Sequence, residues 1–419
     1  MTIAEPELDR PIALRADAAF DGDGPALLGP TQILVLAGRI VAIGPEVDVP
    51  EEAIRLDLGD RTLAPGLIDA HVHCEMTPER LLETFFAESS VLKALYAVKP
   101  MRTLLYQGFT TVRDCASLDP GFGTLDLRLA QQRGLIEGPK MIVCPHMLSA
   151  TGGHGDFAAL RPGLGQEEYV CVADGVDGVQ LAVRRQARAG ADWIKLAASG
   201  GFAGSGNDDP EHVTYTEREL RAAVETAADL GLHVAVHCYG DEAVRRSVVA
   251  GARSIEHASL ASDDTLELAR NTGTYILPTM HFIQDRLRAL DDPERARAMP
   301  PHMRVRFERY RDRLLDRQQA IVTSGVRIAL GSDAGPFPHA DNWREFEALV
   351  AAGASPLQAL RAGTSVAADL LELPDRGRLR EGDTADIVAF DGDPLLDISV
   401  LGRVEFVMQA GRILREPVA

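Results

Sequence analysis

Two histidines in the segment DAHVHCE, His71 and His73, have the spacing of a metal-binding pair. Residues separated by one position face the same side of a β-strand, so both imidazoles would point into the same space. Two imidazoles in this arrangement can chelate a divalent metal ion, although a hydrogen-bonded structural pair has the same pattern. Taken alone, the segment supports metal binding and a structural role about equally.

Four later apolar segments each carry one more potential ligand at or near the end of a short run. These are Lys195 in WIKLAA, His237 in HVAVH, His257 in SIEH and Asp333 in RIALGSD. Each of them alone is more simply explained as a hydrogen-bonded core residue. Five segments that bring such groups to the same end of their strands favour one shared metal centre.

The elements that would position these groups repeat between residues 64 and 372. A short apolar run, a loop with glycine or aspartate, and an amphipathic stretch follow one another, which predicts βα units. The eight candidate strands cover residues 65–73, 110–115, 141–145, 193–198, 233–238, 254–258, 274–279 and 327–333. Eight such units predict an α/β protein with a (β/α)8 TIM barrel, whose active site lies at the carboxyl ends of the strands.

The two flanks of this region have a different pattern. Residues 1–63 and 373–419 contain short alternating runs such as TQILVLAGRIVAIG and VEFVMQAGRIL. Alternation of this kind is typical of antiparallel strands, and neither flank is long enough for a core of its own. We expect the flanks to form one small β-sandwich from both ends of the chain, beside a barrel domain of residues 64–372.

Composition argues against several classes of partner. The 43 basic and 62 acidic residues leave a net charge of −19, which opposes binding to nucleic acid or to an anionic membrane surface. No run approaches the roughly 20 apolar residues of a membrane helix, and the first residues do not resemble a secretory signal. The five cysteines are odd in number and include no Cys-x-x-Cys pair, which predicts reduced thiols. We therefore expect a cytoplasmic protein.

The motifs resemble the amidohydrolase superfamily, in the subtype with two metals bridged by a carboxylated lysine. The resemblance rests on PGLIDAHVH, on His237, His257 and Asp333, and on the C-terminal phrase GRLREGDTADIVAFDGDP. It implies that His71, His73 and Asp333 hold the more buried metal and that His237 and His257 hold the other. Lys195, converted by CO2 to an anionic carbamate, would bridge both ions, since an ammonium group has no lone pair to offer.

The same resemblance implies a mechanism. Two divalent ions would share a hydroxide that attacks the substrate carbonyl, and Asp333 would pass the proton of that hydroxide to the leaving nitrogen. Zinc is the first expectation, because imidazole and carboxylate ligands suit it, and manganese, cobalt or iron fit the same ligands.

Two further segments indicate a smaller class of substrates. IKLAASGGFAGSGNDDP and SATGGHGD resemble the imidazolonepropionase-related group, which includes Xaa-Pro and Xaa-Arg/Lys carboxydipeptidases and enzymes that hydrolyse ochratoxin, phenylureas and thiocarbamates. We expect hydrolysis of an amide bond in a small carboxylate-bearing substrate, such as a dipeptide or an N-acyl amino acid. The relatives are often homo-oligomers, which we expect here by analogy only.

Three more residues are candidates for substrate binding. His154, Tyr239 and His281 are placed after predicted strands, although a loop-stabilising histidine or a packing aromatic residue would have the same pattern. For His281, the plain loop histidine is favoured. Arg113 and Asp114 are expected to form a structural pair near the barrel rim.

Several other functions are weighed against this one. Cyclic amides, ureas and carbamates are alternative substrates. A deaminase is disfavoured because Gly240 stands where such enzymes have an acid, and a non-catalytic scaffold barrel is disfavoured because the set of ligands is complete.

Overall fold

A ring of parallel strands forms the centre of the molecule in the computed structural model, which describes residues 10–78, 88–117, 119, 121–156, 171–204 and 208–417. The strands of the ring are β7 (Leu67–Val72), β8 (Phe109–Asp114), β9 (Lys140–Val143), β10 (Met147–Ser149), β12 (Trp193–Ala197), β13 (His233–Gly240), β14 (Ser254–Leu260), β15 (Tyr275–Leu277) and β16 (Arg327–Ile328). They follow the eight predicted strands in order, with the third divided into β9 and β10.

Two sheets share this ring. One has the order β7-β8-β9, and the other has the order β11-β10-β12-β13-β14-β15-β16, where β11 is the short strand Cys171–Val172. The divided third strand joins them, because β9 pairs with β8 and β10 pairs with β12. On the opposite side, the amide of Ala70 donates to the carbonyl of Leu330 at 2.9 Å, which links β7 to the residues after β16. The predicted barrel fold is confirmed.

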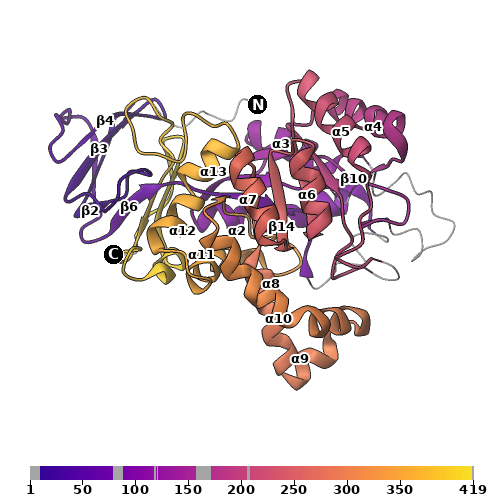
Figure 1. Cartoon of the computed structure of the whole chain (residues 1–419). Coiled ribbons are helices and arrows are strands. Elements are labelled where there is room, and N and C mark those ends of the chain that lie inside the picture. The colour runs from indigo at the N-terminus through magenta and orange to yellow at the C-terminus, as the bar shows by residue number, and fades with distance from the viewer. Residues whose placement is uncertain are drawn as a thin grey trace.

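Helices cover the outside of the barrel between successive strands (Figure 1). They are α2 (Ser90–Tyr106), α3 (Gly123–Gln132), α4 (Gly175–Ala189), α5 (Glu217–Asp229), α6 (Asp241–Val249), α7 (Asp263–Thr272), α11 (Arg344–Ala351), α12 (Pro356–Ala362) and α13 (Ser365–Leu370). Local sequence explains their starts, as at α5, where Thr216 and Glu219 form a reciprocal capping box.

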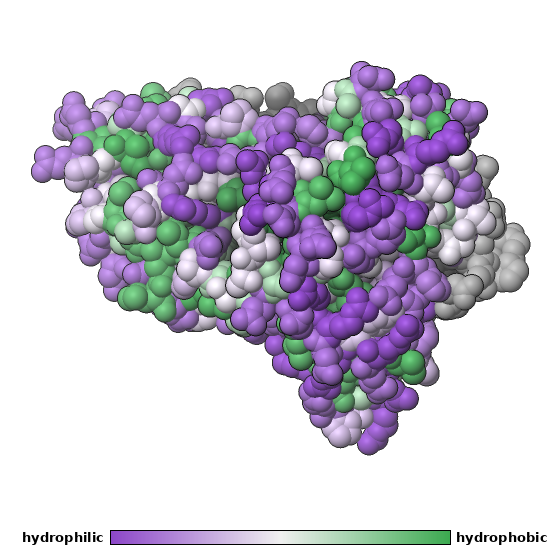
Figure 2. Space-filling model, viewed as in Figure 1, coloured by the Kyte–Doolittle hydropathy of each residue, from purple (hydrophilic) through white to green (hydrophobic). Residues whose placement is uncertain are grey.

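A helical arm projects from the barrel between β15 and β16. It consists of α8 (Met280–Asp291), α9 (Pro293–Ala298) and α10 (Pro301–Thr323), and it extends downward in Figure 1. The surface of this arm is mostly hydrophilic in Figure 2, with small scattered apolar areas. The inner part of α10 is different, since Phe307 and Tyr310 are buried against the barrel.

A small β-sandwich lies beside the barrel and uses both flanks of the chain. One sheet contains β1 (Ile12–Ala16), β3 (Thr31–Leu36), β4 (Arg39–Gly44) and β5 (Ile54–Asp57), and the other contains β2 (Ala18–Ala19), β6 (Thr62–Pro65), β17 (Ile387–Phe390), β18 (Val404–Gln409) and β19 (Arg412–Arg415). The antiparallel pairing of β6 with β17 joins the two flanks. The boundaries at residues 64 and 372 stay a prediction.

Within the described residues, no helix is both long enough and apolar enough to cross a membrane.

Candidate metal centre

The six predicted ligands meet at the carboxyl ends of the barrel strands. His71 is on β7 and His73 follows it, Lys195 is on β12, His237 is on β13, His257 is on β14, and Asp333 follows β16. An oxygen of the Asp333 carboxylate, Oδ1, lies 3.4 Å from Nε2 of His71 and 3.2 Å from Nε2 of His73. Burial would raise the pKa of Asp333, but the facing imidazoles hold it well below its usual range. Asp333 is therefore an anion at neutral pH.

His237 and His257 form the other side of the centre. Nδ1 of His237 and Nε2 of His257 are 2.9 Å apart, and Nδ1 of His257 is 2.8 Å from the hydroxyl of Thr279. Burial lowers the pKa of both histidines well below the usual value, and the positive charges nearby lower it further for His237. Both are thus neutral imidazoles at neutral pH, which is the form that binds a metal ion.

Lys195 lies inside the barrel without a hydrogen-bond partner for its Nζ among the described residues. The residue is only 2 % exposed, so water does not solvate this nitrogen either. A buried, unpaired ammonium group is unfavourable, whereas an anionic group on the same nitrogen would suit a site that collects cations. The position of Lys195 fits the predicted carbamate.

A buried ion pair lies directly beneath these residues. Glu256 on β14 accepts a hydrogen bond from His71 Nδ1 at 2.8 Å through one oxygen and contacts Arg113 at 2.8 Å through the other. The guanidinium of Arg113 also donates to the carbonyl of Ala70. The predicted pairing of Arg113 with Asp114 is wrong, because Asp114 instead accepts the amides of Cys74 and Ala116.

The backbone is left-handed at two of the predicted ligands. His257 has φ 78° and Asp333 has φ 62°, and Thr279, which contacts His257, has φ 48°. This region is rare for residues other than glycine and costs on the order of 1–3 kcal/mol for each residue. Such strain persists where the surrounding structure enforces it, and functional sites are the usual place.

Two of the three predicted substrate-binding residues flank the centre. The ring of His154 stacks on that of His237, with centroids 4.1 Å apart and an angle of 6°. The ring of Tyr239 stacks on His257 at 4.4 Å. Both side chains thus lie against predicted ligands at the barrel mouth. Their part in substrate binding stays a prediction.

His281 is placed differently from the other two. It lies in the first turn of α8, where its ring meets Phe337 edge to face at 5.0 Å. The charged groups that act on the pKa of His281 are Asp285, Arg288, Asp341 and Arg344, which belong to the arm and to the segment around α11. The part of His281 in substrate binding stays a prediction.

The loop after β12 is fixed on the arm. Phe202 stacks on Phe307 of α10 at 4.5 Å and meets Tyr239 edge to face at 4.9 Å. Asp208, in the same loop, pairs with Nδ1 of His154 at 3.0 Å and accepts the amide of Gly201 at 2.8 Å. The arm, which the sequence analysis did not identify, therefore supports one wall of the centre.

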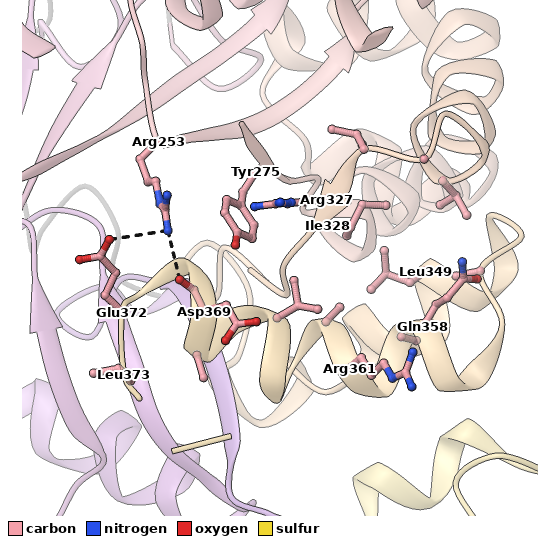
Figure 3. A pocket seen from close by; sticks show the side chains of 18 of the residues that line it. Arg253, Tyr275, Arg327, Ile328, Leu349, Gln358, Arg361, Asp369, Glu372 and Leu373 are labelled. Carbon is pink, nitrogen blue, oxygen red and sulfur yellow. Dashed lines mark hydrogen bonds and ion pairs between the residues drawn. The ribbon is translucent and has the colours of Figure 1, made fainter. Parts of the chain in front are cut away.

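A cavity of about 940 Å3 lies at the opposite ends of the strands (Figure 3). Arg253 and Arg327 lie over the ring of Tyr275, and Arg253 also contacts Glu372 at 3.7 Å and the carbonyl of Asp369 at 3.2 Å. None of the predicted site residues lines this cavity. In barrels of this type the amino ends of the strands serve stability, whereas the chemistry lies at the carboxyl ends.

A model of the amidohydrolase family matches residues 62–414, which include all six predicted ligands. The chain belongs to the amidohydrolase family. This amidohydrolase is 30% identical to the ochratoxinase of Aspergillus niger, in an alignment that covers 100% of this chain and 89% of that enzyme.

Two solved structures resemble the amidohydrolase over nearly its whole length. A Xaa-Pro dipeptidase with methionine bound in its active site is 29% identical with a TM-score of 0.86, and the match covers 97% of this chain and 100% of that one. A prolidase in complex with N-methylphosphonate-L-proline is 31% identical with a TM-score of 0.85 and the same coverage of both chains. The predicted family and its dipeptidase and ochratoxinase groups are confirmed.

The amidohydrolase is thus a metal-dependent hydrolase that acts on amide bonds. The donor atoms of this chain fit that function. Two sets of three potential ligand atoms lie within 4.8 Å of one another in the described residues. One set belongs to His71, His257 and Asp333, and the other belongs to His71, Cys115 and Glu256. The group of His71, His257 and Asp333 lies near Lys195 and His237. In the other group, Glu256 already pairs with Arg113. The group with Asp333 is therefore the better site for divalent ions.

Proposed function

We propose that the chain hydrolyses the amide bond of a small substrate with a carboxylate on the leaving-group side. A dipeptide, an N-acyl amino acid or an ochratoxin-like amide has this structure. The observation that carries the proposal is the full-length match to a dipeptidase that holds methionine and to a prolidase that holds a proline derivative. A free amino acid is the leaving group of such substrates, so the two ligands support this class.

The proposed ligands divide into two groups. His71, His73 and Asp333 would hold the more buried ion, and His237 and His257 would hold the other, with carboxylated Lys195 between them. The short distances from Asp333 to the first pair and the 2.9 Å between the second pair support this division. Two divalent ions would supply hydroxide at neutral pH and polarise the substrate carbonyl. Zinc is proposed first, and manganese, cobalt or iron would suit the same donors.

Asp333 is the proposed general base. Its carboxylate is kept ionised by the imidazoles around it, so it can accept a proton and return it to the leaving nitrogen. His154 and Tyr239 are proposed to contact the substrate. Their rings are fixed by stacking on His237 and His257, which reduces the entropy lost when a substrate is ordered between them.

A substrate screen with metal-loaded enzyme tests this proposal. Dipeptides and N-acyl amino acids are offered, and release of the free amino acid is measured. We expect turnover by the wild type and none by Lys195→Ala, with Lys99→Ala as the control because Lys99 lies exposed on α2. Turnover of cyclic amides, ureas or carbamates alone would replace the proposed substrate class. Near-full activity of Lys195→Ala would contradict the bridged centre.

We also propose that the protein is a cytoplasmic homo-oligomer. The cysteines are Cys74, Cys115, Cys144, Cys171 and Cys238, and all five are free, which supports a reducing compartment. The oligomer rests on analogy alone, and light scattering on the purified protein tests it.

A further inference from the structure

Arg286 brings a positive charge to the segment that follows the predicted ligand Asp333. It lies on α8, and its Nη2 donates to the carbonyl of Pro336 at 3.0 Å. Pro336 is three residues beyond Asp333, in a segment that packs against the metal-binding strand. A Cβ on Gly335, for example, would come within 2.9 Å of the Cβ of His73. The guanidinium is therefore held beside the segment that carries Asp333.

The charge of Arg286 is poorly neutralised within the chain. The nearest carboxylate oxygen, in Asp285, is 3.8 Å from Nη1, and Asp285 makes a shorter contact of 2.8 Å with Arg295. Nε of Arg286 is buried and has no hydrogen-bond partner among the described residues. A guanidinium presents five N–H donors, and leaving one of them buried and unpaired is costly.

Burial and several neighbouring charges act on the pKa of Arg286. Burial and the charge of Arg295 lower the pKa of the guanidinium, the charges of Asp285 and Asp333 raise it, and the net shift is downward. The predicted ligand Asp333 is thus one of the charges that act on Arg286. An anion bound beside Arg286 would supply both the missing charge and an acceptor for its unpaired donor.

Other cations near the centre are already engaged. Arg113 is paired with Glu256 beneath His71, and Arg306 of α10 donates to the carbonyls of Phe202 and Gly204. Arg288, also on α8, is exposed. Among these four arginines, Arg286 is the one with a buried donor atom that has no hydrogen-bond partner in the described residues.

We propose that Arg286 binds the carboxylate of the leaving-group amino acid and so selects substrates with a free carboxylate. The inference rests on the proposed function, because it names the residue that recognises the class of substrate. The planar guanidinium can pair with both oxygens of a carboxylate, which Lys cannot do. The planar side chain lies 5.2 Å from the ring of Phe282, which limits its freedom and favours this geometry.

Binding and turnover together test the proposal. Calorimetry compares L-methionine, L-proline and L-phenylalanine with their primary amides, using metal-loaded wild type, Arg286→Met and Arg286→Lys. Hydrolysis compares the N-acetyl derivatives of the same amino acids, as free acids and as amides. Arg288→Met is the control, because it removes an exposed arginine from the same helix. Unfolding temperatures verify that each variant is folded.

We expect the wild type to prefer each acid over its amide by about 10- to 100-fold, which is the usual range for a charge-assisted hydrogen bond. Arg286→Met should abolish the preference mainly through KM, Arg286→Lys should retain part of it, and Arg288→Met should retain all of it. No preference in the wild type, or an equal preference in Arg286→Met, would overturn the role of Arg286. If the acids bind more tightly than the amides but no compound is hydrolysed, the result contradicts the proposed reaction and still supports carboxylate binding by Arg286.

Discussion

Nδ1 of His71 lies 2.8 Å from a carboxylate oxygen of Glu256, inside the barrel and away from solvent. Burial would raise the pKa of Glu256, but the charge of Arg113 lowers it well below the usual range. The carboxylate is therefore an anion that accepts the Nδ1 proton of His71. This bond fixes the tautomer of His71 and leaves Nε2, the nitrogen that faces Asp333, as the free donor to a metal.

The first prediction concerns this bond. Glu256→Gln should lower the affinity for metal by about 10- to 100-fold, the usual effect of losing a carboxylate that orients a metal-binding histidine. The change also leaves Arg113 as a buried charge without its counterion, which typically costs about 3–5 kcal/mol. Competition with a chelator measures the affinity, and urea unfolding of the metal-free protein measures the stability. Glu267→Gln, at an exposed position on α7, is the control, and equal metal affinity in both variants would refute the orienting role.

Sequence periodicity indicated the ligands but not Glu256, and the backbone at His257 explains the difference. Ser254 and Glu256 face the barrel interior, where both contact Arg113. Simple alternation along β14 would then direct His257 outward. The left-handed φ of 78° at His257 breaks the alternation and allows two successive side chains to reach the interior. A pattern of residue types carries no information on such a local reversal.

Sequence periodicity also could not predict the arm or the contacts that it makes with the barrel. The helical pattern of α10 is ordinary, and nothing in it indicates that Phe307 packs on Phe202 of a loop about a hundred residues earlier. Arg286 resembles the other arginines of this segment in sequence. Only the three-dimensional arrangement separates it from Arg288, which is exposed. The eight strands, by contrast, were predictable because each is a local apolar run with its own turn residues.

The second prediction concerns removal of the metal ions. Without them, the neutral His237 and His257 and the ionised Asp333 remain buried together, and the folded state loses the free energy of metal binding. At free metal concentrations of 100 to 1,000 times the Kd, that loss is about 2.7–4.1 kcal/mol for each ion. We expect a chelator to lower the unfolding temperature of the wild type and added zinc to restore it. Lys195→Ala should respond much less, and an equal response would show that Lys195 does not contribute to metal binding.

The third prediction concerns the pair of Asp208 and His154. The charge of His154 lowers the pKa of Asp208 against the opposing effect of burial, so the carboxylate is ionised and holds the ring on His237. Asp208→Asn should raise KM by roughly 10-fold, because a charge-assisted hydrogen bond is worth about 1.5–3 kcal/mol. Metal content should not change. Asp312→Asn, on the exposed side of α10, is the control, and a loss of metal by Asp208→Asn would point instead to a structural role beneath His237.

The fourth prediction is a pH dependence of stability that comes from His281. Burial lowers the pKa of His281 to about 4, from an ordinary value of 6.5. The unfolded chain therefore binds a proton at higher pH than the folded chain does, so stability falls as the pH drops below about 6.5 and the loss levels off near pH 4. Between pH 8 and pH 5 these two values correspond to at most about 2 kcal/mol. His281→Gln should cost some packing against Phe337 at pH 8 and recover part of that difference at pH 5. Urea unfolding at both pH values measures the change, and a difference between variant and wild type that is independent of pH would show that His281 does not titrate on unfolding.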